Sequence, residues 1–288
     1  MYIYLNGKFV DQKKAVISVF DHGFLYGDGA FEGIRSYNRL VFKLDEHINR
    51  LYETLAALRI DPQLTKKNME KAIVGTLKKN KLKDAYIRVV VSRGEGDLGL
   101  DPKKCYGKPS VIVITDKITL YPQDFYKKGM AIITAKTRRT NATAVDPKLK
   151  TLNYLNNILA KIEASDQGYQ EAIMLDTSGN VSECTGDNIF ITKGGVLTTP
   201  DKNILMGITR RAVLDIAKSE KIKTEERLVT LEEVYKADEC FLTGTAAEII
   251  PVVKVDGRTI GTGKPGAMTQ KMMTLFHAAT RTDGVKYL

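Results

Sequence analysis

Short runs of β-branched residues alternate with amphipathic segments along the 288-residue chain, and this alternation constrains the fold more than any other feature. Ala85–Ser92 has the composition of a strand, whereas the apolar residues of Leu44–Leu58 recur three or four positions apart, as in a helix. The Asn6-Gly7 pair inside Tyr2–Val10 predicts a hairpin. Because strands and helices interleave without a strict βαβ rhythm, we expect a mixed α+β and α/β fold rather than a doubly wound parallel sheet.

The length of the chain allows two modest domains, at about 100–200 residues per domain. The regular pattern breaks between Asp116 and Gly129. We therefore expect a smaller N-terminal α/β domain at 1–117, a linker at 118–128 and a larger C-terminal mixed-sheet domain at 129–288. Further expected strands are Ser110–Thr115, Ala131–Ala135, Ala172–Leu175, Asn188–Thr192, Glu239–Thr243 and Ile249–Val255, and further expected helices are Asn68–Leu77, Leu152–Ser165, Thr209–Lys221 and Thr269–Ala279.

The net charge of +10 comes from 44 basic and 34 acidic residues. Nucleic-acid-binding proteins concentrate such charge on one face, but here it is scattered, so we expect no nucleic-acid partner. No stretch has the roughly 20 apolar residues that a membrane span needs, and the N-terminus lacks the plan of a signal peptide. Three widely spaced cysteines fit neither a disulfide framework nor a zinc site, and together these features predict a cytoplasmic protein.

Two glycine-rich segments resemble phosphate-binding loops without meeting their requirements. Gly94–Gly99 fits G-x-G-x-x-G, but the following residues include Pro102 and cannot open the helix that would hold a pyrophosphate. In Gly261–Gly266, Pro265 stands where a hydroxyl would hold magnesium. The three histidines are far apart, so we expect no metal site.

A single lysine has the most informative surroundings. A loop that contains Pro147 leads to Lys150, just before a helix whose apolar residues we expect to face the core. Burial and a nearby positive helix end would lower the pKa of such a lysine and make it nucleophilic. Tyr154 would share a face with position 150 if the helix began there. By spacing alone, a solvated lysine beside a helix start is the simpler interpretation.

Several motifs in a fixed order favour a catalytic Lys150 over a solvated one. They are Tyr26–Arg35, Tyr86–Arg88, Lys-x-x-Asn-Tyr-Leu at 150–155, Gln170–Asp176, Val181–Phe190, Gly207–Arg210 and Gly244–Ile249. Together the five motifs from Lys150 onward resemble the class IV, fold-type IV, pyridoxal-phosphate aminotransferases, and the two motifs before them narrow the resemblance to the branched-chain amino acid aminotransferases. The resemblance covers about residues 2–262 and implies a two-lobed fold-type IV enzyme.

The resemblance also implies a cofactor and the residues that hold it. Pyridoxal 5′-phosphate needs a lysine for its aldehyde, a carboxylate for its ring nitrogen, and donors for its phosphate and phenolic oxygen. By the match, Lys150 forms the Schiff base and shuttles the proton, Glu183 pairs with the ring nitrogen, and Tyr154 bonds the phenolic oxygen. The phosphate is expected to meet Arg50, the N–H groups of Ile208 and Thr209, and Thr245.

Substrate recognition has to accept both an apolar side chain and the γ-carboxylate of glutamate. A mostly apolar pocket with one cation at its edge meets both demands. By the same resemblance, Tyr26, Phe31 and Tyr86 line the pocket, Arg88 is the edge cation, and the backbone at Thr245 and Ala246 takes the α-carboxylate.

The expected reaction is a ping-pong transfer of the amino group of L-leucine, L-isoleucine or L-valine to 2-oxoglutarate, which gives L-glutamate. Pockets of this family borrow residues such as Tyr26 from a neighbouring subunit, so a homodimer or larger homo-oligomer is expected. The alternatives on the same scaffold are a D-amino acid aminotransferase and an aminodeoxychorismate lyase. A basic nucleic-acid-binding protein is the alternative from another class.

Overall fold

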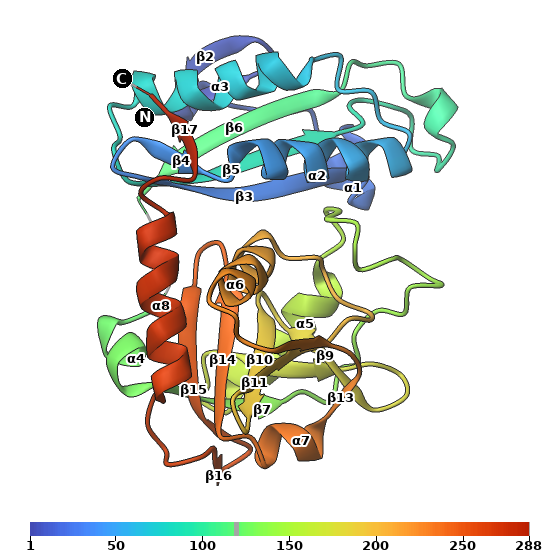
Figure 1. Ribbon diagram of the computed structural model, residues 1–288. Coiled ribbons are helices and arrows are strands. Elements are labelled where there is room, and N and C mark those ends of the chain that lie inside the picture. Colours follow the sequence, from blue (N-terminus) through green and yellow to red (C-terminus); the bar gives the residue numbers. More distant parts are fainter. Residues whose placement is uncertain (118–120, 288) are drawn as a thin grey trace. The chain divides into compact units, whose positions relative to one another are not determined.

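The computed structural model describes residues 1–117 and 121–287, and within them the chain forms two compact units (Figure 1). The first unit contains residues 1–117, the short segment Leu149–Asn153 and residues 280–287. The second unit contains residues 121–148 and 154–279. The chain therefore passes between the units more than once, and the segment that carries Lys150 belongs to the first unit.

The first unit is built on one antiparallel sheet, which has seven strands among the described residues and the order β17-β4-β3-β5-β6-β1-β2. Its strands are β1 (Tyr2–Leu5), β2 (Lys8–Asp11), β3 (Gly29–Tyr37), β4 (Leu40–Phe42), β5 (Ala85–Ser92), β6 (Ser110–Asp116) and β17 (Gly284–Lys286). Its helices are α1 (His22–Tyr26), α2 (Leu44–Ala57) and α3 (Lys66–Lys79), with short 3-10 turns at Gln12–Lys14 and Pro102–Lys104.

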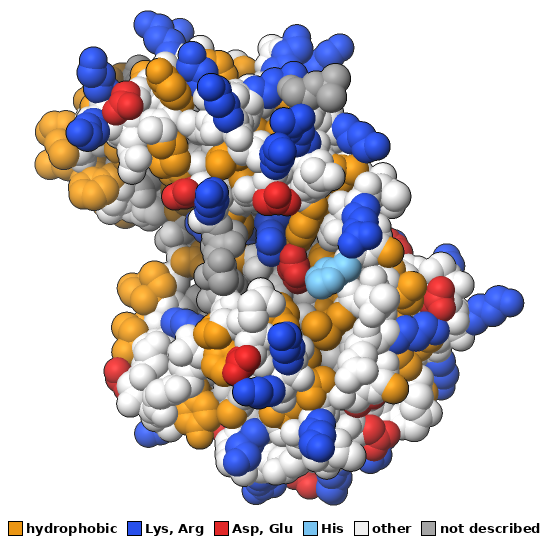
Figure 2. Space-filling view, turned by 90° about the vertical axis from the view of Figure 1, so that its left-hand side faces the viewer, with side chains coloured by type: hydrophobic (Ala, Val, Ile, Leu, Met, Phe, Trp, Pro, Cys, Tyr) orange, Lys and Arg blue, Asp and Glu red, His pale blue; other side chains and the backbone are white. Residues whose placement is uncertain are grey.

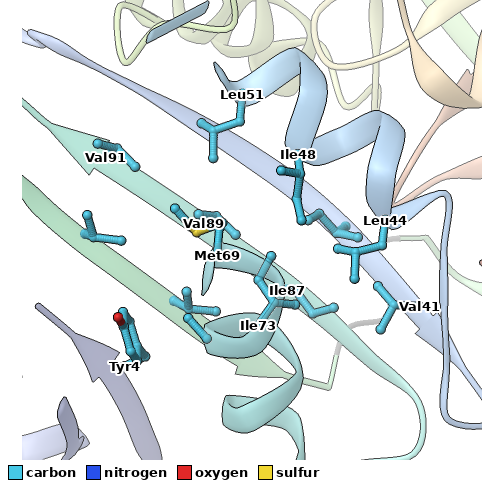
Figure 3. Packing of buried hydrophobic residues seen from close by; sticks show 14 of the residues in the cluster. Tyr4, Val41, Leu44, Ile48, Leu51, Met69, Ile73, Ile87, Val89 and Val91 are labelled. Atoms are coloured by element: carbon cyan, nitrogen blue, oxygen red, sulfur yellow. The ribbon is translucent and has the colours of Figure 1, made fainter. Parts of the chain in front are cut away.

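Helices α2 and α3 cover the same face of this sheet (Figure 1). Their apolar stripes pack on alternate residues of β5, as Figure 3 shows for Leu44, Ile48, Met69, Ile87 and Val89. Because strand side chains alternate between faces, the intervening residues of β3 and β5 lie on the other face of the sheet. The core of the first unit thus fixes which strand residues are left for other contacts.

The second unit is built on a mixed sheet with the order β12-β11-β10-β14-β15-β7-β8-β9-β13, and β16 pairs with β15. Three of its pairs are parallel and the others antiparallel. Its strands are β7 (Met130–Thr134), β8 (Ala172–Leu175), β9 (Asn180–Cys184), β10 (Asn188–Lys193), β11 (Val196–Thr199), β12 (Thr224–Glu226), β13 (Val229–Thr230), β14 (Glu239–Gly244), β15 (Glu248–Val255) and β16 (Arg258–Thr259). Its helices are α4 (Gln123–Lys128), α5 (Leu155–Asp166), α6 (Ile208–Ser219), α7 (Leu231–Tyr235) and α8 (Ala267–Ala279).

The predicted mixed α and β architecture is confirmed, and the predicted hairpin forms around Asn6 and Gly7, both with positive φ. The predicted linker 118–128 falls partly outside the described residues, and its second half forms α4. Gly94–Gly99 is followed by irregular chain and a 3-10 turn, not by an α-helix, which removes the dinucleotide-binding interpretation.

The helix after Lys150 differs from the prediction in two respects. It begins at Leu155, with Tyr154 as its N-cap residue, so Lys150 precedes the helix and does not share a helical face with Tyr154. The expected apolar face is not buried, because Leu155 is 66% exposed, Ile158 52%, Leu159 47% and Ile162 48%. The buried face of α5 consists of small and polar residues, namely Asn157, Ala160 and Ala164.

On one face of the molecule the charge is spread rather than concentrated (Figure 2). On the face shown in Figure 2, Lys and Arg side chains alternate with acidic, apolar and neutral ones. None of the helices in residues 1–117 and 121–287 is long and apolar enough to cross a membrane.

Candidate active site

An aromatic cluster lies on the face of the first sheet that α2 and α3 leave uncovered. Phe31 on β3 and Tyr86 and Arg88 on β5 come from adjacent antiparallel strands. The guanidinium of Arg88 lies 4.6 Å from the Phe31 ring centroid, and its Nη2 donates a hydrogen bond of 2.9 Å to the Tyr86 hydroxyl. The residue opposite Arg88 is Gly33, where a Cβ would collide with the Tyr86 hydroxyl. The three predicted side chains are therefore brought together as an apolar surface with one cation.

Lys150 lies beside this cluster, in an extended segment that pairs with the start of β3. Phe31 N donates to Lys150 O at 3.0 Å, and Leu152 N donates to Gly29 O at 2.9 Å. Lys150 N in turn donates to the hydroxyl of Thr54 on α2 at 3.3 Å. These bonds fix the lysine backbone and place Nζ 4.4 Å from the Phe31 ring centroid. An amine held against an aromatic surface is suited to attack a carbonyl carbon.

The predicted phosphate residue Arg50 lies on the helix-covered side of the same sheet, in a buried ion-pair network. Arg50 on α2 donates from Nε and Nη2 to the two oxygens of Glu32 on β3, at 2.7 and 2.9 Å. His47, one turn earlier, contacts Glu32 Oε2 through Nδ1 at 2.8 Å. This bidentate pairing fixes the orientation of the guanidinium.

The pKa values of both Glu32 and His47 are lowered in this network. Burial alone would raise the pKa of Glu32, but the charges and hydrogen bonds of Arg50 and His47 outweigh it and lower the pKa to about 2. Burial lowers the pKa of His47, and the positive charges of Arg50 and Lys150 act in the same direction against the attraction of Glu32. The result is a buried carboxylate that stays ionised over the physiological pH range.

Tyr26, the other predicted pocket residue, is the last residue of α1. It is 37% exposed, and its hydroxyl donates to the backbone oxygen of Leu98. Its ring contacts the edge of His22, with centroids 5.2 Å apart. Tyr26 is thus presented at the surface of the first unit, and Phe24 of the same helix is also exposed.

In the second unit, Glu183 on β9 is buried and fully engaged by its own neighbours. Arg139 Nε donates to Glu183 Oε1 at 2.8 Å, whereas Oε2 accepts from Asn188 Nδ2 at 3.1 Å and from Leu205 N at 3.0 Å. The charge of Arg139 and the two donors favour the ionised carboxylate. Such a carboxylate can stabilise a positive charge on a ring nitrogen.

The N-terminus of α6 is the second anchoring feature of this unit. Gly207 is its N-cap residue and supplies no side-chain cap, so Ile208 and Thr209 open the helix with N–H groups at its positive end. A Cβ at Gly207 would collide with Asn188 Oδ1, and Asn188 also donates to Leu205 O at 2.9 Å. Asn188 therefore connects the Glu183 carboxylate with the chain that leads into α6.

Thr245 and Ala246 lie in the turn that connects β14 to β15, and both are half-buried. The turn begins after Gly244, against which the carboxylate of Asp187 packs. Tyr154 stands at the N-cap position of α5. The predicted residues of the second unit thus come from the ends of separate strands and helices.

Sequence reasoning missed the residues that orient these groups. Arg139 and Asn188 hold Glu183, Glu32 holds Arg50, and His47 holds Glu32. Asn188 and Glu32 lie inside motifs that carried the family resemblance, so the sequence offered a signal for them. Nothing in its local pattern distinguishes Arg139 from its neighbour Arg138.

The donor set fits pyridoxal 5′-phosphate. The described residues provide an amine for an aldehyde, an ion-paired carboxylate for a ring nitrogen, and an arginine and an uncapped helix N-terminus for a phosphate.

Comparison with known proteins agrees with this donor set. The sequence model described as amino-transferase class IV matches residues 29–255. A Methanocaldococcus jannaschii protein described as a putative branched-chain-amino-acid aminotransferase is 51% identical over 99% of each chain. The crystal structure of the Escherichia coli branched-chain amino acid aminotransferase superposes with a TM-score of 0.94 at 34% identity, covering 96% of this chain and 93% of that one. The T.th. branched-chain amino acid aminotransferase complexed with N-(5′-phosphopyridoxyl)-L-glutamate gives a TM-score of 0.91 at 34% identity, covering 97% and 94%.

Proposed function

The chain belongs to the class IV aminotransferases, and from this we propose that it transfers the amino group of L-leucine, L-isoleucine or L-valine to 2-oxoglutarate, which gives the branched-chain 2-oxo acid and L-glutamate. It is a pyridoxal-phosphate-dependent transaminase. The observation that carries the substrate assignment is the aromatic cluster of Phe31, Tyr86 and Arg88 beside Lys150.

Each anchoring residue has a role in holding the cofactor. When bound, pyridoxal 5′-phosphate supplies an aldehyde that reacts with amines and a protonated ring that stabilises negative charge at the substrate α-carbon. Glu183, held by Arg139, keeps the proton on the ring nitrogen, and Tyr154 bonds the phenolic oxygen. The phosphate is bound by Arg50, by the N–H groups of Ile208 and Thr209, and by the hydroxyl of Thr245.

Lys150 has two roles in the reaction. Its Nζ would hold the cofactor through the aldehyde, and with substrate bound the same amine would take up and return the proton of the substrate α-carbon. The backbone bonds to Phe31 and Thr54 support this assignment, because they fix the backbone from which the amine extends.

The aromatic cluster explains how one site can serve two unlike substrates. The side chain of leucine, isoleucine or valine packs on Phe31, Tyr86 and Tyr26, whereas the γ-carboxylate of glutamate reaches the guanidinium of Arg88. The backbone at Thr245 and Ala246 takes the α-carboxylate that all these substrates share. The similar T.th. enzyme is complexed with a glutamate adduct, which supports glutamate as the second amino acid.

Borohydride reduction followed by peptide mapping tests the assignment of the lysine. The pyridoxyl label is expected on Lys150, and a label on any other lysine would overturn the assignment. Rates with L-leucine, D-alanine and aminodeoxychorismate test the substrate class. A preference for either of the last two would favour the sister activities on this scaffold, and a colourless protein that shifts DNA in a gel would favour the nucleic-acid-binding alternative.

We also propose that the active form is a homodimer or a larger homo-oligomer in the cytoplasm. The support is the exposed apolar stripe of α5, formed by Leu155, Ile158, Leu159 and Ile162, together with the exposed Phe24 and Tyr26 of α1. Contiguous exposed apolar surface marks an interaction site. Sedimentation analysis of the wild type is expected to give at least twice the monomer mass. The double variant Ile158→Lys and Leu159→Lys is expected to give a lower mass. A wild-type monomer that is fully active would refute the proposal.

A further inference from the structure

Two buried carboxylates of the second unit share one hydroxyl. Tyr121 OH lies 3.5 Å from Glu171 Oε2 and 3.4 Å from Asp187 Oδ2, and all three side chains are almost completely buried. Among the described residues, no lysine, arginine or histidine forms an ion pair with either carboxylate. Two like charges so close in a buried site cannot both be ionised without a large cost, so one of the pair holds a proton.

The hydrogen bonds identify which one. Glu171 Oε1 accepts from Ala172 N at 2.8 Å, from Thr185 N at 2.9 Å and from the Thr185 hydroxyl, three donors that stabilise a carboxylate. Within the described part of the chain, the carboxyl of Asp187 has one hydrogen bond, to Tyr121. A proton on Asp187 lets it donate to the Tyr121 oxygen while the Tyr121 hydroxyl donates to Glu171, which satisfies all three groups.

The charged groups around Asp187 act in both directions, and those that favour its protonation outweigh the others. Burial, Glu171 and Glu183 raise the pKa of Asp187, whereas Lys161 on α5 and the bond to Tyr121 lower it, and the outcome is a pKa of about 8. Lys161 itself donates to the backbone oxygen of Gln170 rather than to either carboxylate. Burial raises the pKa of the neighbouring Cys184 thiol well above its usual range, so Cys184 adds no charge near neutral pH.

The place of Asp187 in the fold connects this proton with the active site. A Cβ at Gly244 would collide with Asp187 Oδ1, so the carboxyl lies directly against the backbone that precedes Thr245 and Ala246. On the proposed function, on which this inference rests, that turn binds the substrate α-carboxylate. We propose that Asp187 is a positioning residue that holds a proton in the chain Asp187–Tyr121–Glu171 and so keeps its own carboxyl uncharged beside the Thr245–Ala246 turn, which favours carboxylate binding there.

Ionisation of Asp187 is therefore expected to weaken carboxylate binding. One negative charge at a separation of about 10 Å and an effective dielectric constant of about 20 corresponds to a loss on the order of tenfold. Binding of 4-methylvalerate, which is leucine without its amino group, can be measured by calorimetry on the cofactor-loaded protein between about pH 6.5 and about pH 9.5, values chosen to bracket a pKa of about 8. Asp187→Asn keeps the shape of the side chain but cannot ionise. We therefore expect the wild type to lose affinity on the order of tenfold between the two pH values because of Asp187, and we expect the variant to lack this loss.

A second measurement reads the proton itself and needs no activity. The infrared spectrum of the wild-type protein is expected to contain the carbonyl stretch of a protonated buried carboxylic acid at neutral pH, and this band should disappear on titration above about pH 8 and be absent from Asp187→Asn. In thermal unfolding, a raised pKa in the folded state means that stability falls as pH rises from about 4 to about 8. The melting temperature of Asp187→Asn relative to the wild type is therefore expected to increase over this range.

Asp176→Asn is the matched control, because Asp176 is buried in the same unit but accepts hydrogen bonds from the backbone of Ser178 and Asn180. It should leave the infrared band and the alkaline loss of affinity in place. Absence of the band from the wild type, or equal alkaline losses in the wild type and Asp187→Asn, would overturn the inference. If no variant binds 4-methylvalerate or transaminates leucine while the band titrates as expected, the proposed function fails and the protonation of Asp187 stands.

Discussion

Glu32→Gln is the substitution that most directly tests the buried network beneath the aromatic cluster. Glu32 is fully buried and binds both Arg50 and His47. Its pKa falls from 4.5 to about 2 in the folded protein, a difference of 4.5 − 2 = 2.5 pKa units. At about 1.36 kcal/mol per unit, ionised Glu32 contributes about 3 kcal/mol to the free energy of unfolding near neutral pH. Removal of one partner of a buried ion pair costs a similar amount, roughly 3–5 kcal/mol.

The pH dependence gives the prediction its sign. Because the pKa of Glu32 is lowered by folding, its contribution is complete above the unfolded pKa and is lost as pH falls toward the folded pKa of about 2. The difference in unfolding free energy between the wild type and Glu32→Gln is therefore expected to shrink from about 3 kcal/mol at about pH 7 to about 2 kcal/mol at about pH 3.5.

Urea unfolding of the two proteins at both pH values measures this difference. Glu46→Gln is the control, since Glu46 lies on the same helix with a side chain 47% exposed and pairs with Lys43 at 3.0 Å. An exposed pair of this kind contributes roughly 0–1 kcal/mol. Affinity for pyridoxal 5′-phosphate should also fall in Glu32→Gln, because Arg50 loses the carboxylate that orients it. A variant within about 1 kcal/mol of the wild type at neutral pH, or a difference that grows toward acid pH, would refute the reasoning.

Three further substitutions test the site. Gly33→Ala would place a methyl group on the Tyr86 hydroxyl, so kcat/KM for leucine is expected to fall about tenfold or more at a stability cost of about 1–3 kcal/mol. Arg88→Met should raise KM for glutamate by roughly 10–100-fold, the effect of one charge-assisted bond, and change KM for leucine much less; equal effects on both would contradict the edge-cation role. Asn188→Ala removes donors to Glu183 and to Leu205, and spectroscopic titration should show about tenfold weaker cofactor binding.

The residues that carry local patterns could be predicted from the sequence. The strand at Ala85–Ser92 matches β5 residue for residue, and the helix at Leu44–Leu58 ends one residue earlier in the structure. Both have strong periodicity and clear boundaries, which is where such patterns are most informative. The grouping of Phe31, Tyr86 and Arg88 came from the family resemblance, and the pairing of β3 with β5 is the physical reason that these side chains meet.

Pairing between distant segments could not be predicted in this way. The segment around Lys150 reads locally as the start of a helix, but its backbone bonds go to Gly29 and Phe31, more than a hundred positions away. Arg139 lies 44 positions from Glu183 and has no pattern that distinguishes it from other basic residues. Ion pairs and strand partners of this kind depend on the tertiary fold, to which a local window gives no access.

Helix α5 shows why a correct periodicity can still lead to the wrong face. Its apolar residues recur at helical spacing, which predicts a helix but does not say what covers them. The side of α5 that meets its own unit is formed by Asn157, Ala160 and Ala164, whose small volume lets the helix lie close to the sheet, and Asn157 Nδ2 donates to Thr185 O at 2.9 Å. Since the core side is already filled, the apolar stripe remains exposed, and it is the surface on which the proposed homo-oligomer rests.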